Sequence, residues 1–350
     1  MILLGAVLVL GRWMPQQGSR RKWYIAAMVL LHTLLCGLRH PHLTGDLMKY
    51  HWEFLFQGRA GWAILARNPG FSLAMQGIYR VFDGNFQIFL FVTAAVSQLA
   101  AGWVIWKDSP APWLSYLTLH CLGFFVFGFS AVKQALGMAF VLLAFRGIAE
   151  NRPKFFFAMV ALAGAVHLPM LAFLPAYFLT RFRVDRAVLA AYVLAGVLLF
   201  CCREPAAEAA RQLYYGESDP LVWSGGPGGR FFLMVLITAA GLLLRGTEDV
   251  QFGKVFHLMA VSCVLQLFSG FDHVFTRLAD VYFQFSVLYL PAMVLEPGNG
   301  GLAMNRRSRK LLAVAAAVFL IWYYYETNLS VNIENSVDNY WNFRFFWQMR

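Results

Sequence analysis

Four polar residues share one face of a predicted helix in a strongly apolar part of the chain. Apolar runs over about residues 255–269 and 285–295 flank this helix. The polar residues are His273, Arg277, Asp280 and Gln284. Their positions, i, i+4, i+7 and i+11, line up along one side of a helix, and polar groups at the edge of a bilayer core often mark a site. The alternative is an Arg–Asp pair that only joins two helices, and this stretch alone does not decide between the two interpretations.

The segment 39–85 repeats this spacing. A helix is predicted to begin at Gly45, and its polar residues again fall at i, i+4, i+7 and i+11. They are Asp46, Tyr50, Glu53 and Gln57. Apolar residues occupy the other faces, so this helix is predicted to lie on a membrane surface. A second surface helix is predicted from Asn68 to Phe82.

The composition indicates an integral membrane protein. Of the 350 residues, 59% are hydrophobic and 13% are charged, and the mean hydropathy is +0.57. In soluble proteins, about a quarter of all residues are usually charged. The net charge of +11 comes from short basic clusters between apolar runs. We therefore interpret it through membrane topology, and predict no nucleic-acid partner.

The apolar runs predict an all-α, GT-C-like bundle of about 11–12 spans, each near the ~20 residues that cross a bilayer core. The predicted spans are 1–14, 23–38, 86–106, 113–130, 132–148, 155–167, 168–180, 187–202, 231–244, 255–271, 278–295 and 311–325. All basic clusters lie on the cytoplasmic side if 155–180 is a hairpin of two half-spans near Pro169. If 155–180 were instead one long span, the basic clusters that follow it would lie on the opposite side of the membrane. The hairpin is preferred, and it places both termini outside the cytoplasm.

No repeat or separate soluble domain is visible, so residues 1–350 are predicted to form a single integral membrane domain. Its long external segments are 39–85, 203–230 and the tail 326–350. The topology, argued from loop charge alone, brings several unusual polar residues to the external face: Asp46, Lys133, His167, Arg277 and Asp280.

Three of these residues also have simpler interpretations. Asp46 is suited to cap a helix, Lys133 to reach from a span to the membrane interface, and His167 to bond a carbonyl at a helix break.

Cations near two acids suggest a ligand whose leaving group is negatively charged. Arg and Lys stabilise a departing diphosphate, and a carboxylate accepts the proton of an attacking hydroxyl. The G-x-S-x-G, P-loop and H-E-x-x-H motifs are absent. His40 and His42 alone do not define a metal site. No cofactor is required by the sequence, although a divalent cation (Mg²⁺ or Mn²⁺) is compatible with the acids Asp46, Glu53, Asp272 and Asp280.

The order of several short motifs resembles the EpsG family of bacterial polysaccharide polymerases. The matching residues are, in order, Arg39, Thr44-Gly45-Asp46 with Tyr50, Asn68-Pro69-Gly70-Phe71, Lys133-Gln134, Val166-His167-Leu168-Pro169, Arg277 with Tyr282-Phe283, and Tyr340 with Phe343-Arg344-Phe345-Phe346. Two departures weaken the comparison. Lys133 stands where the family has an arginine that could grip a phosphate with two bonds. Thr44-Gly45-Asp46-Leu47 replaces a Gly-Thr-Asp-Tyr pattern.

The resemblance implies a GT-C-type glycosyltransferase of the bacterial inner membrane. It would join undecaprenyl-diphosphate-linked oligosaccharides outside the cytoplasm, in exopolysaccharide or capsule synthesis. The implied catalytic residues are Asp46 as base, Arg277, Asp280 and His167. The implied diphosphate-binding residues are Arg39, Lys133, Gln134 and His273, and the sugar-binding residues are Tyr50, Glu53 and Tyr282. The implied partners are the lipid-linked oligosaccharide, the bilayer, and chain-length or export proteins.

Three other functions remain open. A flippase or transporter would need polar residues near the bilayer midplane, whereas most charges here fall at one face. A membrane O-acyltransferase could use His167 as its base, although the extra cations suit a diphosphate better. A structural subunit of an export complex would need no site.

Overall fold

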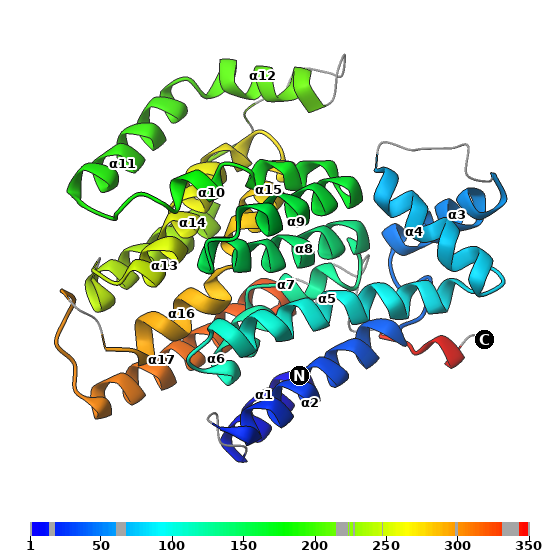
Figure 1. The fold of residues 1–350 in the computed structure, drawn as a ribbon, viewed down its shortest axis with the longest axis horizontal. Coiled ribbons are helices and arrows are strands. Elements are labelled where there is room, and N and C mark those ends of the chain that lie inside the picture. The colour runs from blue at the N-terminus through cyan, green and yellow to red at the C-terminus, as the bar shows by residue number, and fades with distance from the viewer. Residues whose placement is uncertain are drawn as a thin grey trace. The chain divides into compact units, whose positions relative to one another are not determined.

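The chain is helical in a computed structural model that describes residues 2–13, 18–60, 68–214, 223, 225–226, 228–246, 248–297, 300–330 and 343–348. Helices account for 81% of the structure (Figure 1). Within the described ranges there is no strand, and an isolated antiparallel bridge joins Arg39 to Phe345. The predicted all-α, polytopic membrane fold is confirmed.

The chain divides into two compact units, which we describe separately. Unit 1 comprises Met1–Leu171 and Lys310–Arg350, and unit 2 comprises Ala172–Arg309. The prediction of a single integral membrane domain stays a prediction.

Unit 1 contains the N-terminal helices and most of the last long helix. They are α1 (Ile2–Trp13), α2 (Ser19–Gly37), α3 (Gly45–Ala60), α4 (Pro69–Val81), α5 (Phe86–Asp108), α6 (Pro112–Cys121), α7 (Phe124–Phe127), α8 (Val132–Ala149), α9 (Pro153–Val166) and α17 (Arg306–Tyr324). The two helices predicted in the segment 39–85 are therefore present, as α3 and α4.

Unit 2 contains the helices between these two parts. They are α10 (Ala176–Leu179), α11 (Arg186–Cys201), α12 (Arg203–Tyr214), α13 (Gly228–Arg245), α14 (Val250–Gln266), α15 (His273–Phe283) and α16 (Ser286–Leu295). A short 3₁₀ helix, Leu267–Gly270, connects α14 to α15.

Local sequence signals explain where many of these helices begin. Prolines occupy the first turns of α4, α6 and α9, where the missing N–H costs no hydrogen bond. The Asn85 side chain accepts bonds from Gln87 N at 3.0 Å and Ile88 N at 3.3 Å before α5. Asp249 and Asp272 cap α14 and α15 in the same way.

The predicted spans coincide with helices, but these differ in length. Among the described residues, four segments are long and apolar enough to cross a membrane: Phe86–Asp108, Val132–Ala149, Gly228–Arg245 and Val250–Gly270. Two bent pairs, α11 with α12 and α15 with α16, raise the number to at most six. The larger number of crossings inferred from the sequence stays a prediction.

The helix predicted to break near Pro169 does break there. α9 ends at Val166, His167 is extended, and Leu168–Phe173 forms a 3₁₀ helix. The hairpin over 155–180 stays a prediction, because these residues extend from unit 1 into unit 2.

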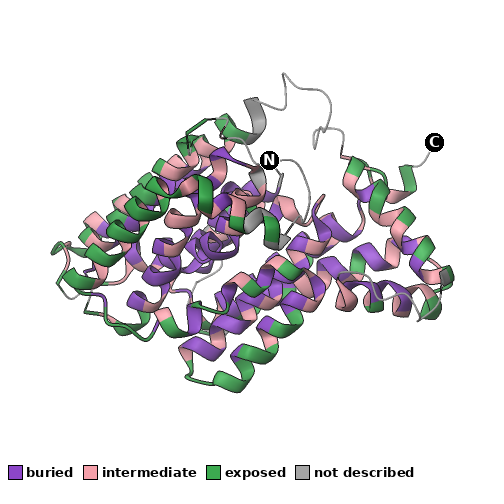
Figure 2. Ribbon diagram, turned by 90° about the horizontal axis from the view of Figure 1, so that it is seen from above, coloured by how far each residue is buried: buried purple, intermediate pink, exposed green. Residues whose placement is uncertain are grey.

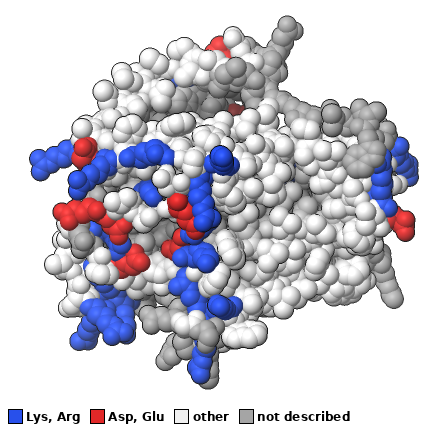
Figure 3. All heavy atoms as spheres, in the orientation of Figure 1, with Lys and Arg blue, Asp and Glu red and all other residues white. Residues whose placement is uncertain are grey.

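A buried aromatic core holds the surface helices of unit 1 to its long helices. Phe54 of α3, Phe71 of α4 and Phe89 of α5 are each fully buried in one cluster. Figure 2 shows the buried positions on the inward sides of helices and the exposed positions on their other sides. Charged side chains gather in patches with a broad uncharged surface between them (Figure 3), as expected where helices face lipid.

The packing of α8 on α9 yields a first prediction. A Cβ on Gly147 would lie 2.7 Å from the backbone N of Phe156, and a backbone atom cannot easily move away. Gly147→Ala should therefore destabilise the protein by about 1–3 kcal/mol. The measurement is thermal unfolding of the purified protein in detergent.

Gly77→Ala is the matched control. Gly77 lies inside α4, and no atom lies within 4 Å of the position that a Cβ would take there. Alanine at this position should therefore be neutral or slightly stabilising. Equal unfolding temperatures for the two variants would contradict the close packing of α8 on α9.

Candidate functional site

Lys133 is the centre of a polar cluster in unit 1. Its ammonium lies 3.7 Å from a carboxylate oxygen of Glu53, which joins α8 to α3. It also lies 5.6 Å from the Tyr50 ring centre and 4.9 Å from that of Phe71. The Lys133 side chain is only 17% exposed. The carboxylate of Glu53 and the two aromatic rings stabilise the charge of this largely buried ammonium.

The structure brings Lys133 together with Tyr50 and Glu53, although Lys133 is far from them in sequence. Their roles in binding diphosphate and sugar stay predictions. Gln57, on the same predicted face of α3, is instead buried, and its side-chain oxygen accepts a bond from Gln76 at 3.3 Å.

Other segments predicted to be external also meet within unit 1. The Asn68 side chain accepts a bond from the backbone N of Leu168 at 3.1 Å, which joins the start of α4 to the end of α9. A Cβ on Gly137 of α8 would lie 3.3 Å from the His167 Cβ. Gln134 is buried, and its side-chain nitrogen lies 3.8 Å from the Met138 sulfur.

Asp46 lies in the first turn of α3 but is not its cap. Thr44 is the cap, since its hydroxyl accepts a bond from Leu47 N at 3.3 Å. The Asp46 carboxylate is 44% exposed and lies 3.8 Å from the Lys49 ammonium, a weak surface pair. The position is suited to a carboxylate, because the amino end of a helix is partly positive. Asp46 is thus open to solvent and to a ligand.

Arg39 is a fully buried cation of unit 1, at 1% exposure. Its guanidinium bonds the Cys36 carbonyl and lies 6.0 Å from the Phe129 ring centre. The C-terminal segment holds its backbone, since His40 N bonds Arg344 O at 2.7 Å and Phe346 N bonds Leu38 O at 3.0 Å.

Burial lowers the pKa of Arg39 to about 10, so the residue is still charged at neutral pH. The structure therefore places a fixed positive charge after α2. Its predicted contact with a diphosphate stays a prediction.

A histidine cluster lies beside Arg39. The His42 Nε2 and His51 Nδ1 atoms are 2.9 Å apart, and the His51 ring stacks on Phe86. Burial and the neighbouring His42 lower the pKa of His51. Across the described ranges, no group of three or more His, Cys, Asp or Glu residues is arranged to hold a metal ion. The compatible divalent cation stays a prediction.

Asp280 and Arg230 form a buried ion pair in unit 2. The Arg230 guanidinium donates to the Asp280 carboxylate, whose side chain is 3% exposed. Arg230 also lies 5.8 Å from the Phe283 ring centre. The exposed Arg277, one turn before Asp280, adds a second positive charge that acts on the same carboxylate. The predicted proximity of Arg277 and Asp280 on α15 is therefore present.

The other residues singled out near α15 have different surroundings. Tyr282 is 1% exposed, and its hydroxyl donates to the Ala172 carbonyl at 2.6 Å. The structure thus gives Tyr282 a packing contact, and its sugar contact stays a prediction. Gln284 follows the end of α15 and bonds the Val281 carbonyl. The side chain of His273 lies outside the described part of the structure.

An apolar pocket of about 650 Å³ lies between α11, α13 and α14 in unit 2. Its lining includes Gly196 and Phe200 from α11, Phe231 from α13, Ala260 from α14, and Leu267 from the 3₁₀ helix that follows α14. No residue of α11 is buried, so this helix exposes apolar side chains beyond the pocket as well. The pocket is in the size range of ligand sites.

One arginine lies beside the lining of this pocket, and a second directly precedes a lining residue in the sequence. The Arg203 guanidinium is 5.1 Å from the Phe200 ring centre and 5.3 Å from that of Trp223. Arg230 directly precedes Phe231, another lining residue. Apolar lining with a cation beside it is suited to an amphipathic anion.

Sequence reasoning did not identify Arg203 or Arg230. Each is a single arginine at the boundary of an apolar run, at the end of 187–202 and the start of 231–244. The position of a single arginine at the boundary of an apolar run could therefore have identified both residues as candidates. The pairing of Arg230 with Asp280 had no local signature, because fifty positions separate the two residues.

Unit 1 brings together Tyr50, Glu53 and Lys133, and unit 2 brings together Arg277 and Asp280. A single site that includes residues of both units stays a prediction.

The comparisons with known proteins give one match. The sequence model of the EpsG family matches residues 22–345 of the chain, a range that includes every residue assigned to a site. No curated protein and no solved structure matches significantly.

The Arg230–Asp280 pair yields a second prediction. Arg230→Gln would leave a buried carboxylate without its main partner, a change that typically costs about 3–5 kcal/mol. We expect the lower part of this range, since the Arg230 side chain is 28% exposed. Thermal unfolding of the purified variant in detergent measures the loss.

The double variant Arg230→Gln/Asp280→Asn is the control, because it removes both charges and leaves a neutral amide at each position. It should recover most of the lost stability. An Arg230→Gln protein as stable as the unmodified one would show that the pair does not stabilise unit 2.

Proposed function

Because the chain belongs to the EpsG family, we propose that it is a membrane glycosyltransferase that polymerises undecaprenyl-diphosphate-linked oligosaccharides outside the cytoplasm. Family membership supports a polysaccharide polymerase in the broad sense. The lipid-diphosphate donor, the reaction and the roles of individual residues are our proposal.

In the proposed reaction, a sugar hydroxyl of one lipid-linked repeat attacks the anomeric carbon of the sugar on another lipid diphosphate. A new carbon–oxygen bond forms, and the bond from the anomeric carbon to the diphosphate oxygen breaks. The proton of the hydroxyl goes to a carboxylate, and the lipid diphosphate leaves with its negative charge. The protein must therefore supply a base and stabilise a departing anion.

This proposal rests on the apolar pocket between α11, α13 and α14 of unit 2, together with the arginine beside it. The pocket is suited to an isoprenoid chain, and the Arg203 guanidinium lies 5.1 Å from the ring centre of Phe200, a lining residue. In the proposed complex, Arg203 and Arg277 neutralise the diphosphate. Asp280 orients Arg230 and limits the local excess of positive charge.

The polar cluster of unit 1 is proposed to bind sugar. Aromatic faces such as that of Tyr50 pack well against sugar rings, and Glu53 can accept bonds from hydroxyl groups. Lys133 holds Glu53 in place and adds positive charge. Asp46 is proposed as the base, because its carboxylate is accessible at the start of α3. His167 and Arg39 are proposed to orient the polar groups of this unit.

Replacement of the proposed base or cation gives a third prediction. In cells that depend on this gene, Asp46→Asn and Arg277→Ala should each abolish long polymer, because proton removal or charge neutralisation is lost. Polymer length on gels is the measurement, with protein level in the membrane measured in parallel.

Asp83→Asn and Arg59→Ala are the matched controls, since both remove an exposed charge outside the proposed site. They should leave polymer length unchanged. Normal polymer in both Asp46→Asn and Arg277→Ala would disprove the proposed roles.

A transporter is the second candidate, favoured by two histidines buried inside helices of unit 1. His32 of α2 and His120 of α6 are 0% and 5% exposed, and their ring centres are 6.4 Å apart. Ionisable residues inside a membrane segment often belong to a transport path.

His32→Phe separates the two functions and gives a fourth prediction. Phenylalanine preserves the ring contact with Phe125, now 4.6 Å between centres, but cannot transfer a proton. A polymerase should retain at least about half of its polymer, because the change does not reach the proposed base. Loss of polymer together with accumulation of single repeats on the cytoplasmic side would favour a transporter.

A further inference from the structure

A second pocket, of about 600 Å³, lies between α2 and α5 in unit 1. Val29 of α2 and Gly102 of α5 both line it, and a Cβ on Gly102 would clash with Val29, so the helices nearly touch there. Leu30 and Leu99, also in the lining, are 56% and 60% exposed. The pocket is therefore open at the exposed apolar surface of the helix pair.

One end of this pocket combines two lysines with two tryptophans. The Lys22 ammonium lies 5.6 Å from the Trp106 ring centre. The Lys107 ammonium lies 4.3 Å from that of Trp106 and 5.2 Å from that of Trp103. Lys22 and both tryptophans line the pocket. Tryptophan is typical of the membrane–water interface, where lysine side chains reach lipid phosphates.

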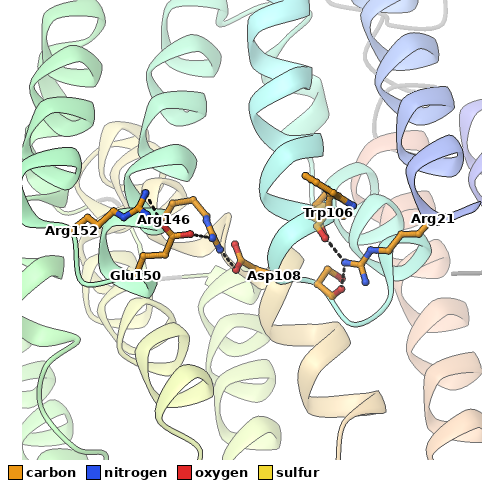
Figure 4. A network of polar contacts seen from close by, with 8 residues as sticks. Arg21, Trp106, Asp108, Arg146, Glu150 and Arg152 are labelled. Atoms are coloured by element: carbon orange, nitrogen blue, oxygen red, sulfur yellow. Dashed lines mark hydrogen bonds and ion pairs between the residues drawn. The ribbon is translucent and has the colours of Figure 1, made fainter. Parts of the chain in front are cut away.

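Arg21 fixes this end of the pocket through backbone contacts. Its guanidinium donates to the carbonyls of Trp106 at 2.7 Å and Ser109 at 2.6 Å (Figure 4). These carbonyls lie at the end of α5, where backbone acceptors lack partners within the helix. Arg21 thus ties the start of α2 to the end of α5 and holds Lys22 beside Trp106.

The nearby acids are already neutralised. Asp108 is paired with Arg146, and Glu150 is paired with Arg146 and with Arg152 at 3.0 Å (Figure 4). Within the described ranges, Lys22 and Lys107 have aromatic faces as partners and form no ion pair. The end of the pocket therefore carries an uncompensated positive charge next to an apolar cavity.

We infer that this pocket binds an anionic phospholipid, with an acyl chain between α2 and α5 and the phosphate at Lys22 and Lys107. The charge at the pocket end matches a negative headgroup, and the open apolar lining matches an acyl chain. The predicted topology places this end in the cytoplasmic leaflet, where anionic lipids attract basic residues.

This site is separate from the one proposed for catalysis. Lys22 lies at the start of α2 and Arg39 directly after its end. A helix of this length places its ends roughly 25 Å apart, so a phosphate at Lys22 lies far from Arg39 and from the polar groups of unit 1 that Arg39 is proposed to orient. The phospholipid therefore acts as a bound structural or regulatory lipid and not as the glycosyl donor.

Native mass spectrometry of the purified full-length protein tests the inference. The probes are phosphatidylglycerol and phosphatidylcholine with identical chains, and inorganic phosphate. We expect phosphatidylglycerol to be retained preferentially and inorganic phosphate not to compete, because the chain contributes to binding. Lys22→Gln/Lys107→Gln should weaken retention of phosphatidylglycerol about tenfold or more.

Lys154→Gln/Lys310→Gln is the control, because it removes two exposed lysines of the same unit outside the pocket. It should retain phosphatidylglycerol as the unmodified protein does. Ala26→Phe fills the pocket from an exposed position and should weaken binding without disturbing the fold.

Three results would overturn the inference. The first is equal retention of the two phospholipids, and the second is equal loss in the two double variants. The third is displacement of phosphatidylglycerol by undecaprenyl diphosphate at equal concentration, which would assign the pocket to the carrier lipid. Binding that follows the expected pattern in a protein without polymerase activity would still support this site, because its assignment does not depend on the proposed reaction.

Discussion

The high free-energy cost of an unpaired charge in an apolar environment organises this protein. Charged residues are few, and two largely buried pairs join residues of different helices: Lys133 with Glu53, and Arg230 with Asp280. Arg245 similarly joins Asp249 and Glu296, the latter at 2.9 Å. Such pairs are costly to break, so they fix the arrangement of helices around them. The same pairs leave a smaller number of cations, such as Lys22, for contacts with lipids.

This constraint explains which parts of the structure the sequence could predict. Apolar periodicity located the helices, and local signals located their ends: Pro69 at the start of α4, and the break at His167 before α10. Pairing across the fold was harder to predict. Asp280 could be identified as unusual from its apolar surroundings, but its partner Arg230 lies in a different helix. The sequence also did not show which polar side chains would be buried. Tyr282 was predicted to bind a sugar, but in the structure it contacts Ala172 and Phe173.

The two units present different chemistry. Unit 1 offers Lys133, which is paired with the Glu53 carboxylate and surrounded by aromatic rings. This surface is suited to sugar hydroxyls. Unit 2 offers an apolar pocket with Arg203 beside its lining, which is suited to a lipid diphosphate. A polymerase of lipid-linked sugars needs both kinds of surface. Membership of the EpsG family supports this class of function, and the residues proposed here give it a chemical basis.

The most direct test uses the purified protein in nanodiscs with a synthetic undecaprenyl-diphosphate-linked oligosaccharide. Our account predicts a ladder of products, each longer by one repeat, and one undecaprenyl diphosphate released for each bond formed. The same reaction with EDTA shows whether a divalent cation takes part. A donor that binds to the protein but stays intact, with the correct repeat as acceptor, would contradict the proposed glycosyl transfer.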